Sequence, residues 1–462
     1  MQQLKPLPRD LTQGARSFPG GVHPSEHKEI TEALAIERLA LPSQIILPLA
    51  MHAGAPARPT VGKKDEVARA QRVGEASGFV SAPVHSPVFG TVSDVTAVPH
   101  QSGRMVRAIL IRTDIERTQE AIEAEAEQRV DADLDLSPYE PRKITEAAKE
   151  GGLVGLGGAA FPTYIKLTRI EKKPTDIALL NGSECEPYLT ADHRMMLEQP
   201  GAILAGLRLA MKATGASRGA IGIEDNKPDA LRTMRQALSA AGVPEPIDIV
   251  ALKTKYPQGG ERSLIPAITG RAVPVGGFPP DAGVAILNVG TAAALAYAVA
   301  HGRPLIERVL TLTGPGIAQP GNLLVPIGTP IRHLVEQRGG PTEDAARVIL
   351  GGPMMGPAAA QLDLPVMKGM SGITILTEAQ TRPRKEVACI RCGRCVDVCP
   401  SGLMPATLAR LVIKRRIAEA RDQHLLACVE CGSCAYICPS HIPLVQYLRS
   451  GKALVRALPK ES

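Results

Sequence analysis

The spacing of apolar and polar residues changes in character several times along the chain. Residues 30–110 carry short apolar runs that Gly and Pro interrupt, which is typical of short β-strands joined by turns. The acidic stretch IERTQEAIEAEAEQRV, residues 115–130, predicts a helical linker whose charges face solvent. From 142 to 300 helical and strand patterns alternate, which favours an α/β layer around a mainly parallel sheet. Residues 306–375 predict a small mixed β domain.

One uncharged stretch, AGVAILNVGTAAALAYAVA over residues 282–300, is long enough to be considered as a membrane span. It is rich in Ala and Gly, however, and it contains the polar residues Asn288 and Thr291. A buried strand followed by a helix in a soluble core explains it better. Any association of this chain with a membrane is therefore expected to be peripheral.

The composition is that of an ordinary globular protein with many turns. The chain has 462 residues, 44% of them hydrophobic and 21% charged, and this length favours about three domains. Its net charge of +7 fits acidic protein partners or a membrane surface, and does not by itself indicate nucleic acid. The N-terminal residues lack an apolar core and a cleavage signal, so we expect the chain to stay in the cytosol.

Eight of the nine cysteines stand in two copies of one motif near the C-terminal end. Both copies, CIRCGRCVDVCP at 389–400 and CVECGSCAYICP at 428–439, have the spacing C-x2-C-x2-C-x3-C-P. In two-cluster bacterial ferredoxins three cysteines of one copy bind a [4Fe–4S] cluster, and the fourth binds the cluster of the other copy. The two ligand sets are therefore assigned as Cys389, Cys392, Cys395 and Cys438, and as Cys428, Cys431, Cys434 and Cys399. Structural zinc and disulfides fit this spacing less well.

The stretch GGLVGLGGAAFPTYIKL, residues 151–167, is the second candidate for chemistry. Gly155, Gly157 and Ala160 fit the dinucleotide pattern G-x-G-x-x-A. A Rossmann fingerprint has to follow a strand, whereas a helical pattern precedes this loop and Pro162 interrupts the place of the next helix. The dinucleotide assignment is therefore weak.

The same loop still has properties that suit a ligand. Gly155, Gly157 and Gly158 allow the backbone to approach a flat or phosphorylated ligand closely. Lys166 offers a positive charge to a phosphate, and Phe161 can stack on an aromatic ring. For the loop taken alone, the alternative is a plain glycine-rich turn with a phenylalanine in the core.

The first β-rich region resembles a biotinyl- or lipoyl-type barrel-sandwich, whose two halves correspond to VGKKDEVARAQRV and SAPVHSPVFGTV. Domains of that type present a lysine at a hairpin tip for covalent attachment. No lysine occurs between Lys64 and Lys143, so we expect this domain to be structural.

Three stretches of the central region resemble the NADH-binding flavoprotein subunit of respiratory complex I. They are GLGGAAFPTYIK, NGSECEP at 181–187 and YPQGGE at 256–261, and the similarity covers about 150–370. In that family the three stretches enclose FMN, NADH stacks above it, and a small β-grasp domain follows. The whole chain, with its barrel-sandwich and its two cluster motifs, resembles the C subunit of the Rnf-type ion-translocating oxidoreductase.

The resemblance implies which residues form the cofactor sites. Those implied to contact FMN are Gly155, Gly157, Gly158, Lys166, Asn181, Ser183, Glu184, Tyr256, Gly259, Gly260, Glu261, Asn288 and Thr291. Phe161 and Glu186 are implied to face the nicotinamide nucleotide. The chain departs from complex I flavoproteins at Leu156, where they have Arg, and at Gly260, where they have an acidic residue. The resemblance therefore supports the nucleotide contacts less firmly than the flavin contacts.

These features predict a multidomain α+β protein in four parts. They are a barrel-sandwich with its linker (1–125), an α/β domain for FMN and NADH (126–304), a small β-grasp domain (305–378) and a ferredoxin-like helical module with two clusters (379–462). A basic group, Arg410, Lys414, Arg415 and Arg416, follows the first cluster motif. Such a group is ordinarily a solvated face, and the functional alternative is docking to an acidic partner or to lipid headgroups.

The function expected from the resemblance is electron transfer in a membrane-bound complex. It implies a peripheral subunit on the cytoplasmic face of a bacterial inner membrane that passes electrons between NAD(H), FMN and two [4Fe–4S] clusters. The implied partners are an iron–sulfur subunit, integral membrane subunits and, through the complex, ferredoxin or flavodoxin, but not nucleic acid. The alternatives are a cobalamin reductase of bacterial metabolosomes and an electron-conducting or scaffold subunit that binds no nucleotide.

Overall fold

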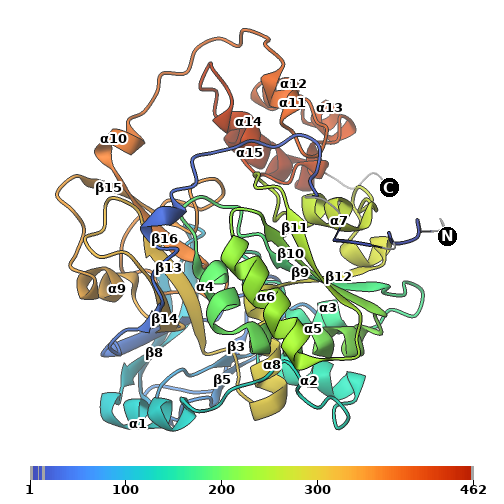
Figure 1. The fold of residues 1–462 in the computed structure, drawn as a ribbon. Helices are drawn as coiled ribbons and strands as arrows, with labels where there is room; N and C mark the ends of the chain where they lie inside the picture. Colours follow the sequence, from blue (N-terminus) through green and yellow to red (C-terminus); the bar gives the residue numbers. More distant parts are fainter. Residues whose placement is uncertain (1–3, 9, 13–15, 459–462) are drawn as a thin grey trace.

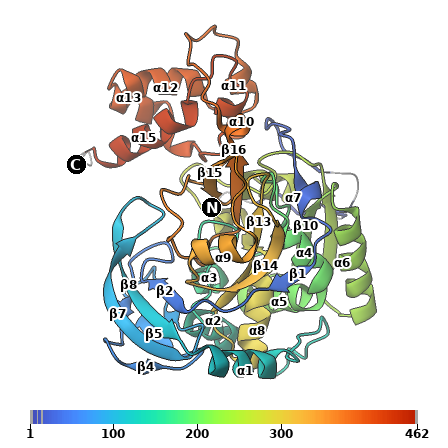
Figure 2. The same cartoon turned by 90° about the vertical axis from the view of Figure 1, so that its left-hand side faces the viewer.

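The computed structural model describes residues 4–8, 10–12 and 16–458. Figure 1 shows the C-terminal helices as a separate layer, which the short helix α10 (Glu378–Thr381) and an extended segment join to the rest. Figure 2 shows the barrel-sandwich, the β-grasp sheet and the α/β domain side by side beneath that layer. The α+β organisation expected from the sequence is confirmed.

Two antiparallel sheets form the barrel-sandwich. In sheet order their strands are β2 (Gln44–Pro48), β8 (Met105–Thr113), β7 (Gly90–Pro99) and β4 (Glu66–Val67), then β3 (Arg58–Pro59), β5 (Arg72–Glu75) and β6 (Val84–His85). Ile45 and Leu47 of β2 are fully buried, as the period of two along a half-buried strand requires. The predicted acidic helix follows as α1 (Ile115–Glu125), which starts at Asp114 because that carboxylate caps its first turn.

The α/β domain is built on a four-stranded parallel sheet. Its order is β11 (Ile247–Leu252), β10 (Arg218–Glu224), β9 (Ile177–Gly182) and β12 (Val284–Asn288). Helices cover both faces, so the strands are apolar throughout. Ile177 and Leu179 pack with α7 (Glu261–Thr269), whereas Ala178 and Leu180 pack with α5 (Pro200–Thr214) and α8 (Val289–His301). The uncharged stretch 282–300 is thus a buried strand followed by a helix, as predicted.

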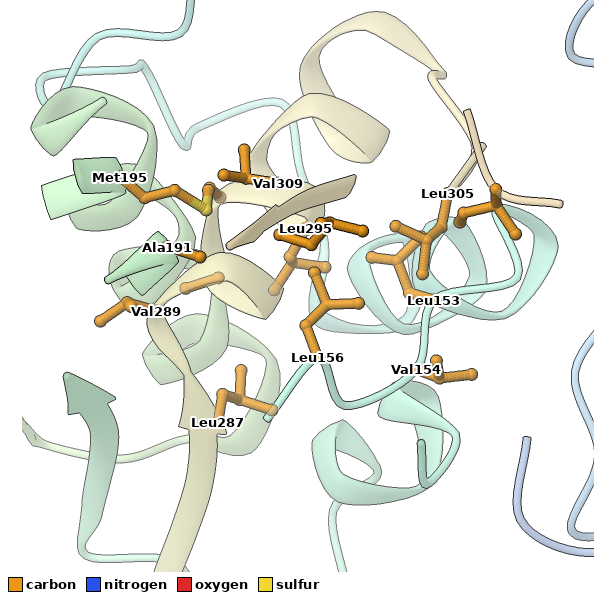
Figure 3. Packing of buried hydrophobic residues seen from close by; sticks show 14 of the residues in the cluster. Leu153, Val154, Leu156, Ala191, Met195, Leu287, Val289, Leu295, Leu305 and Val309 are labelled. Carbon is orange, nitrogen blue, oxygen red and sulfur yellow. The ribbon is translucent and has the colours of Figure 1, made fainter. Parts of the chain in front are cut away.

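A loop on an apolar base leads from α2 (Pro141–Glu150) into this domain. Leu153 and Leu156 are buried on either side of Val154, and Figure 3 shows their side chains directed toward Leu295 of α8. The glycine-rich tip that follows is therefore attached to residues that pack in the hydrophobic core. The helix before the loop also agrees with the expectation that no strand precedes it.

The β-grasp domain has a five-stranded mixed sheet and the helix α9 (Ile331–Gln337). Its order is β1 (Ile36–Arg38), β14 (Gly321–Pro326), β13 (Glu307–Thr313), β16 (Gly372–Thr377) and β15 (Ala345–Leu350). The edge strand β1 comes from the N-terminal part of the chain and pairs in parallel with β14.

Residues 16–31, here called the N-terminal strap, cross the α/β domain and reach the C-terminal module (Figure 1). Val22 forms an antiparallel bridge with Tyr256, and the amide of Gly21 donates a 2.9 Å hydrogen bond to the carbonyl of Val398. From the sequence, residues 16–31 are expected to belong to the part that holds the barrel-sandwich. In the structure these residues also contact the α/β domain and the C-terminal module, and such pairing of a single extended segment leaves no periodic pattern in the sequence.

The C-terminal module packs five helices around a small apolar core. They are α11 (Arg394–Asp397), α12 (Pro405–Ile413), α13 (Ile417–Asp422), α14 (Ser433–Tyr436) and α15 (Leu444–Arg456). The two cysteine motifs adopt the same backbone. Arg391 and Glu430 have φ of 56° and 59°, and Gly393 and Gly432 have φ of 78° and 83°. The internal repeat seen in the sequence is therefore also a structural repeat.

The close contact of α5 with α8 generates a prediction. A Cβ added at Gly206 would lie 1.9 Å from the carbonyl oxygen of Ala292, so Gly206→Ala forces the two helices apart. Overpacking of a core costs about 1–3 kcal/mol, and we expect the midpoint of thermal unfolding to fall by several degrees. Gly62→Ala is the matched control, because its nearest contact would be 3.9 Å away. An unchanged midpoint for Gly206→Ala would contradict this view of the core.

Candidate functional site

The candidate site begins where the parallel strands end. Asn181 of β9 and Asn288 of β12 are register partners at the carboxyl ends of neighbouring strands. After β9 the chain continues to β10 on one side of β9, and it later forms β12 on the other side. Open parallel sheets bind ligands at the carboxyl ends of the strands where the strand order reverses in this way. The glycine loop lies against these strand ends: the amide of Leu156 donates to Oγ1 of Thr291 at 2.9 Å, and a Cβ added at Gly157 would lie 3.4 Å from the side chain of Asn288.

The tip of the glycine loop is open to solvent. Gly157, Gly158 and Ala159 are exposed, and a Cβ added at Gly158 would meet no atom within 4 Å. Gly158 has φ of 113°, a conformation that favours glycine. The amide of Gly155 closes the loop by donating to the carbonyl of Phe161 at 2.9 Å. The loop therefore presents bare backbone, which suits close approach by a flat ligand.

Lys166 lies beneath the loop, on the short helix α3 (Thr163–Leu167). Its ammonium donates a 3.2 Å hydrogen bond to the carbonyl of Ile286 in β12. Burial lowers the pKa of Lys166, and the negative charge of Glu261 opposes this effect. An ammonium has three donors, so Lys166 is able to bind a polar ligand group as well. Glu261 itself is exposed at the start of α7, which Gly260 caps.

The second and third stretches are joined by Asn181. Its amide nitrogen donates to the carbonyl of Gly259 at 2.8 Å, and its amide oxygen accepts from the backbone of Ser183 at 3.1 Å. The amide of Gly259 in turn points at the sulfur of Cys185, 3.3 Å away. The structure therefore brings together the stretches 181–187 and 256–261, which are distant in sequence.

Two of the residues implied to contact FMN are helix caps in the structure. The carboxylate of Glu184 accepts from the amides of Asp192 and His193, at 2.8 and 3.1 Å, in the first turn of α4 (Ala191–Glu198). The amide oxygen of Asn288 accepts from the backbone of Gly290 at 2.9 Å at the start of α8. Asn288 also donates to Asp192 at 2.6 Å. Both side chains thus fix the walls of the site.

Each of the three stretches also contributes a buried polar group without a hydrogen-bond partner among the described residues. These groups are the hydroxyls of Thr163 and Ser183 and both amide atoms of Gln258. Buried polar groups are normally paired, so a set of unpaired ones calls for an explanation. A polar, flat cofactor such as FMN provides one, and the residues present fit it. Thr163 and Gln258 were missed in the sequence analysis, although both lie inside the quoted stretches.

Two buried lysines that the sequence analysis also missed hold the second stretch. Lys28 of the strap donates to the carbonyls of Glu184, Glu186 and Leu189, at 2.9, 3.0 and 2.6 Å. Lys227 donates to the carbonyl of Ser183 at 2.7 Å. Burial lowers the pKa of Lys28, and the neighbouring Lys227 lowers it further. Four carbonyls of one loop are thus bound by two ammonium groups. Nothing in the sequence around Lys28 indicates this role.

Glu186 and Tyr256 face the C-terminal module. Glu186 accepts from the amide of Met354 at 3.0 Å and lies 3.5 Å from the hydroxyl of Tyr256, and burial raises the pKa of Glu186 to about 7. The Tyr256 side chain is 1% exposed, and its hydroxyl donates to the carbonyl of Cys431 at 2.7 Å. Val22 and Met354 pack in the same apolar cluster. The α/β domain, the β-grasp domain, the strap and the second cysteine motif therefore meet here.

One predicted ligand set is brought together inside the C-terminal module. Burial raises the pKa of the Cys434 thiol to about 12, with further contributions from the nearby Cys431, Cys428 and Cys399. The same four cysteines line one pocket of the module. Left-handed residues precede each motif helix, and backbone turns built from such residues form the concave amide groups that suit iron–sulfur clusters. The side chains present therefore fit a [4Fe–4S] cluster.

The other ligand set lies at the surface of the module. Burial raises the pKa of Cys395, and the nearby Cys392 and Cys438 contribute to the increase. Cys389 and Cys392 are exposed. Within the described residues, no three His, Cys, Asp or Glu side chains converge as they would around a single metal ion. The cysteines of an iron–sulfur cube surround a larger group, and the repeated motif fits that group.

Comparison with protein families divides the chain in the same order as the structure. Residues 16–116 match the RnfC barrel sandwich hybrid domain, and residues 148–297 match the Nuo51 FMN-binding domain. Residues 309–358 match the SLBB domain, and residues 388–442 match the 4Fe-4S dicluster domain. The FMN-binding fold thus covers all three stretches of the candidate site.

Related proteins extend over most of the chain. The C subunit of the Na(+)-translocating ferredoxin:NAD(+) oxidoreductase complex of Acetobacterium woodii is 43% identical over 85% of this chain and 86% of that protein. The C subunit of the proton-translocating ferredoxin:NAD(+) oxidoreductase complex of Clostridium ljungdahlii is 42% identical over 88% and 87%. The C subunit of the ion-translocating oxidoreductase complex of Rhodobacter capsulatus is 41% identical over 94% and 82%.

Among solved structures, an NAD+-reducing [NiFe]-hydrogenase in its H2-reduced state shares the fold. The TM-score is 0.51 at 20% identity, over 76% of this chain and 74% of that one. The fold and the two kinds of site define a multidomain flavin and iron–sulfur electron-transfer protein. The chain belongs to the family formed by the C subunits of the ion-translocating oxidoreductase complexes.

The bonds of Lys28 predict a defect in flavin binding. Lys28→Met removes three hydrogen bonds to loop carbonyls, so the loop loosens and we expect FMN to bind at least about tenfold more weakly, equal to 1.4 kcal/mol. Titration of the flavin-free protein with FMN, followed by flavin fluorescence, measures this change. Lys63→Met removes an exposed lysine and is expected to bind FMN normally. Equal affinity of both variants would show that Lys28 does not hold the site.

Proposed function

We propose that this chain is the NAD(H)-linked electron-transfer subunit of a membrane-bound, ion-translocating complex. In this proposal FMN lies between the three stretches at the carboxyl end of the parallel sheet, and two [4Fe–4S] clusters lie in the C-terminal module. The observation that carries the proposal is the contact between these sites. The hydroxyl of Tyr256, in the third stretch, donates to the carbonyl of the cluster ligand Cys431 at 2.7 Å.

FMN exchanges two electrons with a nicotinamide as a hydride and exchanges electrons singly with iron–sulfur clusters, so it supplies the chemistry of the site. The chain binds and orients it. The open backbone at Gly157 and Gly158 admits the ring, Lys166 supplies positive charge, and the unpaired groups of Ser183 and Gln258 offer hydrogen bonds. Phe161 and Glu186 remain the candidates for contact with the nicotinamide.

The two ligand sets occupy different places on the electron route in this proposal. Cys431, in the set that includes Cys428, Cys434 and Cys399, lies against Tyr256 and is buried. Cys389 and Cys392, in the other set, are exposed. The first set is therefore the one that exchanges electrons with the flavin, and the second set exchanges electrons with molecules outside this chain.

The proposed setting is the cytoplasmic face of a bacterial inner membrane, with an iron–sulfur subunit and integral membrane subunits as partners. Three related proteins are named as subunits of ion-translocating oxidoreductases, two of them acting between ferredoxin and NAD+. Across the described ranges of the chain, none of the helices has the length and apolarity to span a bilayer. We therefore place the chain as a peripheral member of such a complex.

A metabolosome cobalamin reductase and an electron-conducting scaffold without nucleotide binding remain the rival functions. The match of the N-terminal region to the RnfC barrel sandwich supports the translocating complex over the reductase. The unpaired polar groups in the three stretches support flavin binding over the scaffold. Flavin content and reactivity toward NADH separate these functions by experiment.

The experiment is an anaerobic titration. The chain is purified with its clusters intact, its flavin and iron are quantified, and NADH is added while absorbance is followed in the flavin and cluster bands. We expect about one FMN and eight iron atoms per chain, from one flavin site and two four-iron clusters, and bleaching of both bands. A protein without flavin, whose clusters are reduced by dithionite and not by NADH, would instead be an electron-conducting subunit.

The bond between Tyr256 and Cys431 yields a kinetic prediction. Tyr256→Phe removes a hydrogen bond worth about 0.5–1.5 kcal/mol, so the domain contact loosens while the chain stays folded. In stopped-flow reduction by NADH, we expect a longer delay between bleaching of the flavin and of the clusters. Tyr297→Phe, on α8, is the control and should show the delay of the unmodified protein. An unaltered delay in Tyr256→Phe would exclude the phenol as a link between the sites.

A further inference from the structure

The aromatic side chain of Phe79 is exposed for no reason that the fold supplies. Phe79 lies in the loop 76–83, which joins β5 to β6 of the barrel-sandwich, and its side chain is 81% exposed. This is the largest exposed fraction of any large apolar residue in the described ranges of the chain. Burying a phenylalanine side chain stabilises a folded protein. The exposure of Phe79 gives up that contribution, which contact with a bound ligand restores.

The backbone around Phe79 is held in place. The amide of Ala55 donates to the carbonyl of Val80 at 2.9 Å. The hydroxyl of Ser81, which is fully buried, donates to the carbonyl of Ala55 at 2.9 Å and lies 3.1 Å from a ring nitrogen of His52. These bonds join the segment 52–55 to the loop 76–83. A fixed loop therefore presents Phe79 to solvent.

Both of these segments lie against the glycine loop and the helix that follows it. The amide of Ala53 donates to the carbonyl of Ala160 at 3.0 Å, directly after the exposed tip at 157–159. The hydroxyl of Tyr164, in α3, donates to the carbonyl of Phe79 itself. An exposed aromatic residue of the barrel-sandwich thus lies at the edge of the candidate flavin site.

A nicotinamide dinucleotide has groups that match this edge. Its nicotinamide has to stack on the flavin to exchange a hydride, which leaves its pyrophosphate and its adenine ring to reach beyond the flavin. Lys149 of α2 is exposed, and its ammonium lies 5.8 Å from the centre of the Tyr164 ring, so positive charge is available to the pyrophosphate. A base stacks on an aromatic side chain through its flat face and needs no hydrogen bonds there. The exposed ring of Phe79 therefore suits the adenine ring.

We propose that Phe79 stacks on the adenine ring of NAD(H), so that the barrel-sandwich forms the outer wall of the nucleotide site. The inference rests on the proposed function, because it requires a dinucleotide at the flavin. Phe79 binds the end of the dinucleotide that does not react, and the nicotinamide keeps its place whether or not the phenyl ring is present. The domain that the sequence predicts to be structural then also contributes to substrate binding.

Phe278 supplies a matched control. Its side chain is 69% exposed, and it precedes the amino end of β12. Asn288, at the carboxyl end of the same strand, marks the candidate site, so Phe278 lies at the opposite edge of the sheet. Phe79→Ala and Phe278→Ala each remove one exposed phenyl ring and differ in where that ring lies on the protein. Phe79→Tyr keeps an aromatic ring at position 79.

The test compares ligands that have the adenine ring with one that lacks it. The unmodified chain and the three variants are purified anaerobically, and their flavin and iron contents are required to agree. Calorimetry measures the binding of NAD+, of ADP-ribose, which has the adenine and no nicotinamide, and of nicotinamide mononucleotide, which has the nicotinamide and no adenine. Reduction of the flavin is then followed at increasing NADH. ADP-ribose binds without hydride transfer, so a chain that NADH fails to reduce still tests Phe79.

Phe79→Ala should weaken the binding of NAD+ and of ADP-ribose about tenfold, equal to 1.4 kcal/mol, and leave that of nicotinamide mononucleotide unchanged. KM for NADH should rise by a similar factor at constant kcat, because the reacting ring is not affected. Phe79→Tyr and Phe278→Ala should bind all three ligands as the unmodified chain does. The proposal is overturned if Phe79→Ala binds ADP-ribose normally, if it loses affinity for nicotinamide mononucleotide to the same extent, or if the unmodified chain binds no ADP-ribose.

Discussion

The candidate site depends on one physical constraint, which is that the loop 183–189 has to keep an irregular conformation directly after strand β9. Its carbonyls cannot all join a helix or a strand, and two buried ammonium groups bind four of them. A buried charge is stable only when it is fully hydrogen-bonded, so Lys28 and Lys227 require the loop as much as the loop requires them. Because Lys28 comes from the strap, the conformation of the candidate flavin site depends on a segment far from it in sequence.

This arrangement also brings the α/β domain, the β-grasp domain and the C-terminal module together around Glu186 and Tyr256. The loop directs Glu186 at the amide of Met354 in the β-grasp domain, and Tyr256 reaches the carbonyl of Cys431 in the C-terminal module. Val22 of the strap pairs with Tyr256 by backbone bonds. Among the described residues, none of these contacts comes from a strand of the barrel-sandwich. The α/β domain, the β-grasp domain and the C-terminal module are thus joined here by a small number of directional contacts.

Local patterns predicted much of the fold. The spacing of the cysteines implied a structural repeat, and the uncharged stretch 282–300 proved to be a strand and a helix because its residues are apolar on every face. The three glycine-containing stretches indicated the site through their resemblance to a family. Contacts that join distant segments left no such pattern. Lys28 and Gln258 look like ordinary polar residues in the sequence, and only burial distinguishes them.

The strap also bears on the biosynthesis of the protein. Its partners Tyr256 and Val398 leave the ribosome long after residues 16–31 have been made. A segment that is made early is therefore among the last to reach its final place, whereas domains built from local contacts fold as they emerge. Until Val398 has been made, Gly21 lacks its hydrogen-bond partner in the C-terminal module. The strap thus contacts both the candidate flavin site and the C-terminal module, and a chain truncated before Val398 leaves the strap without its partner there.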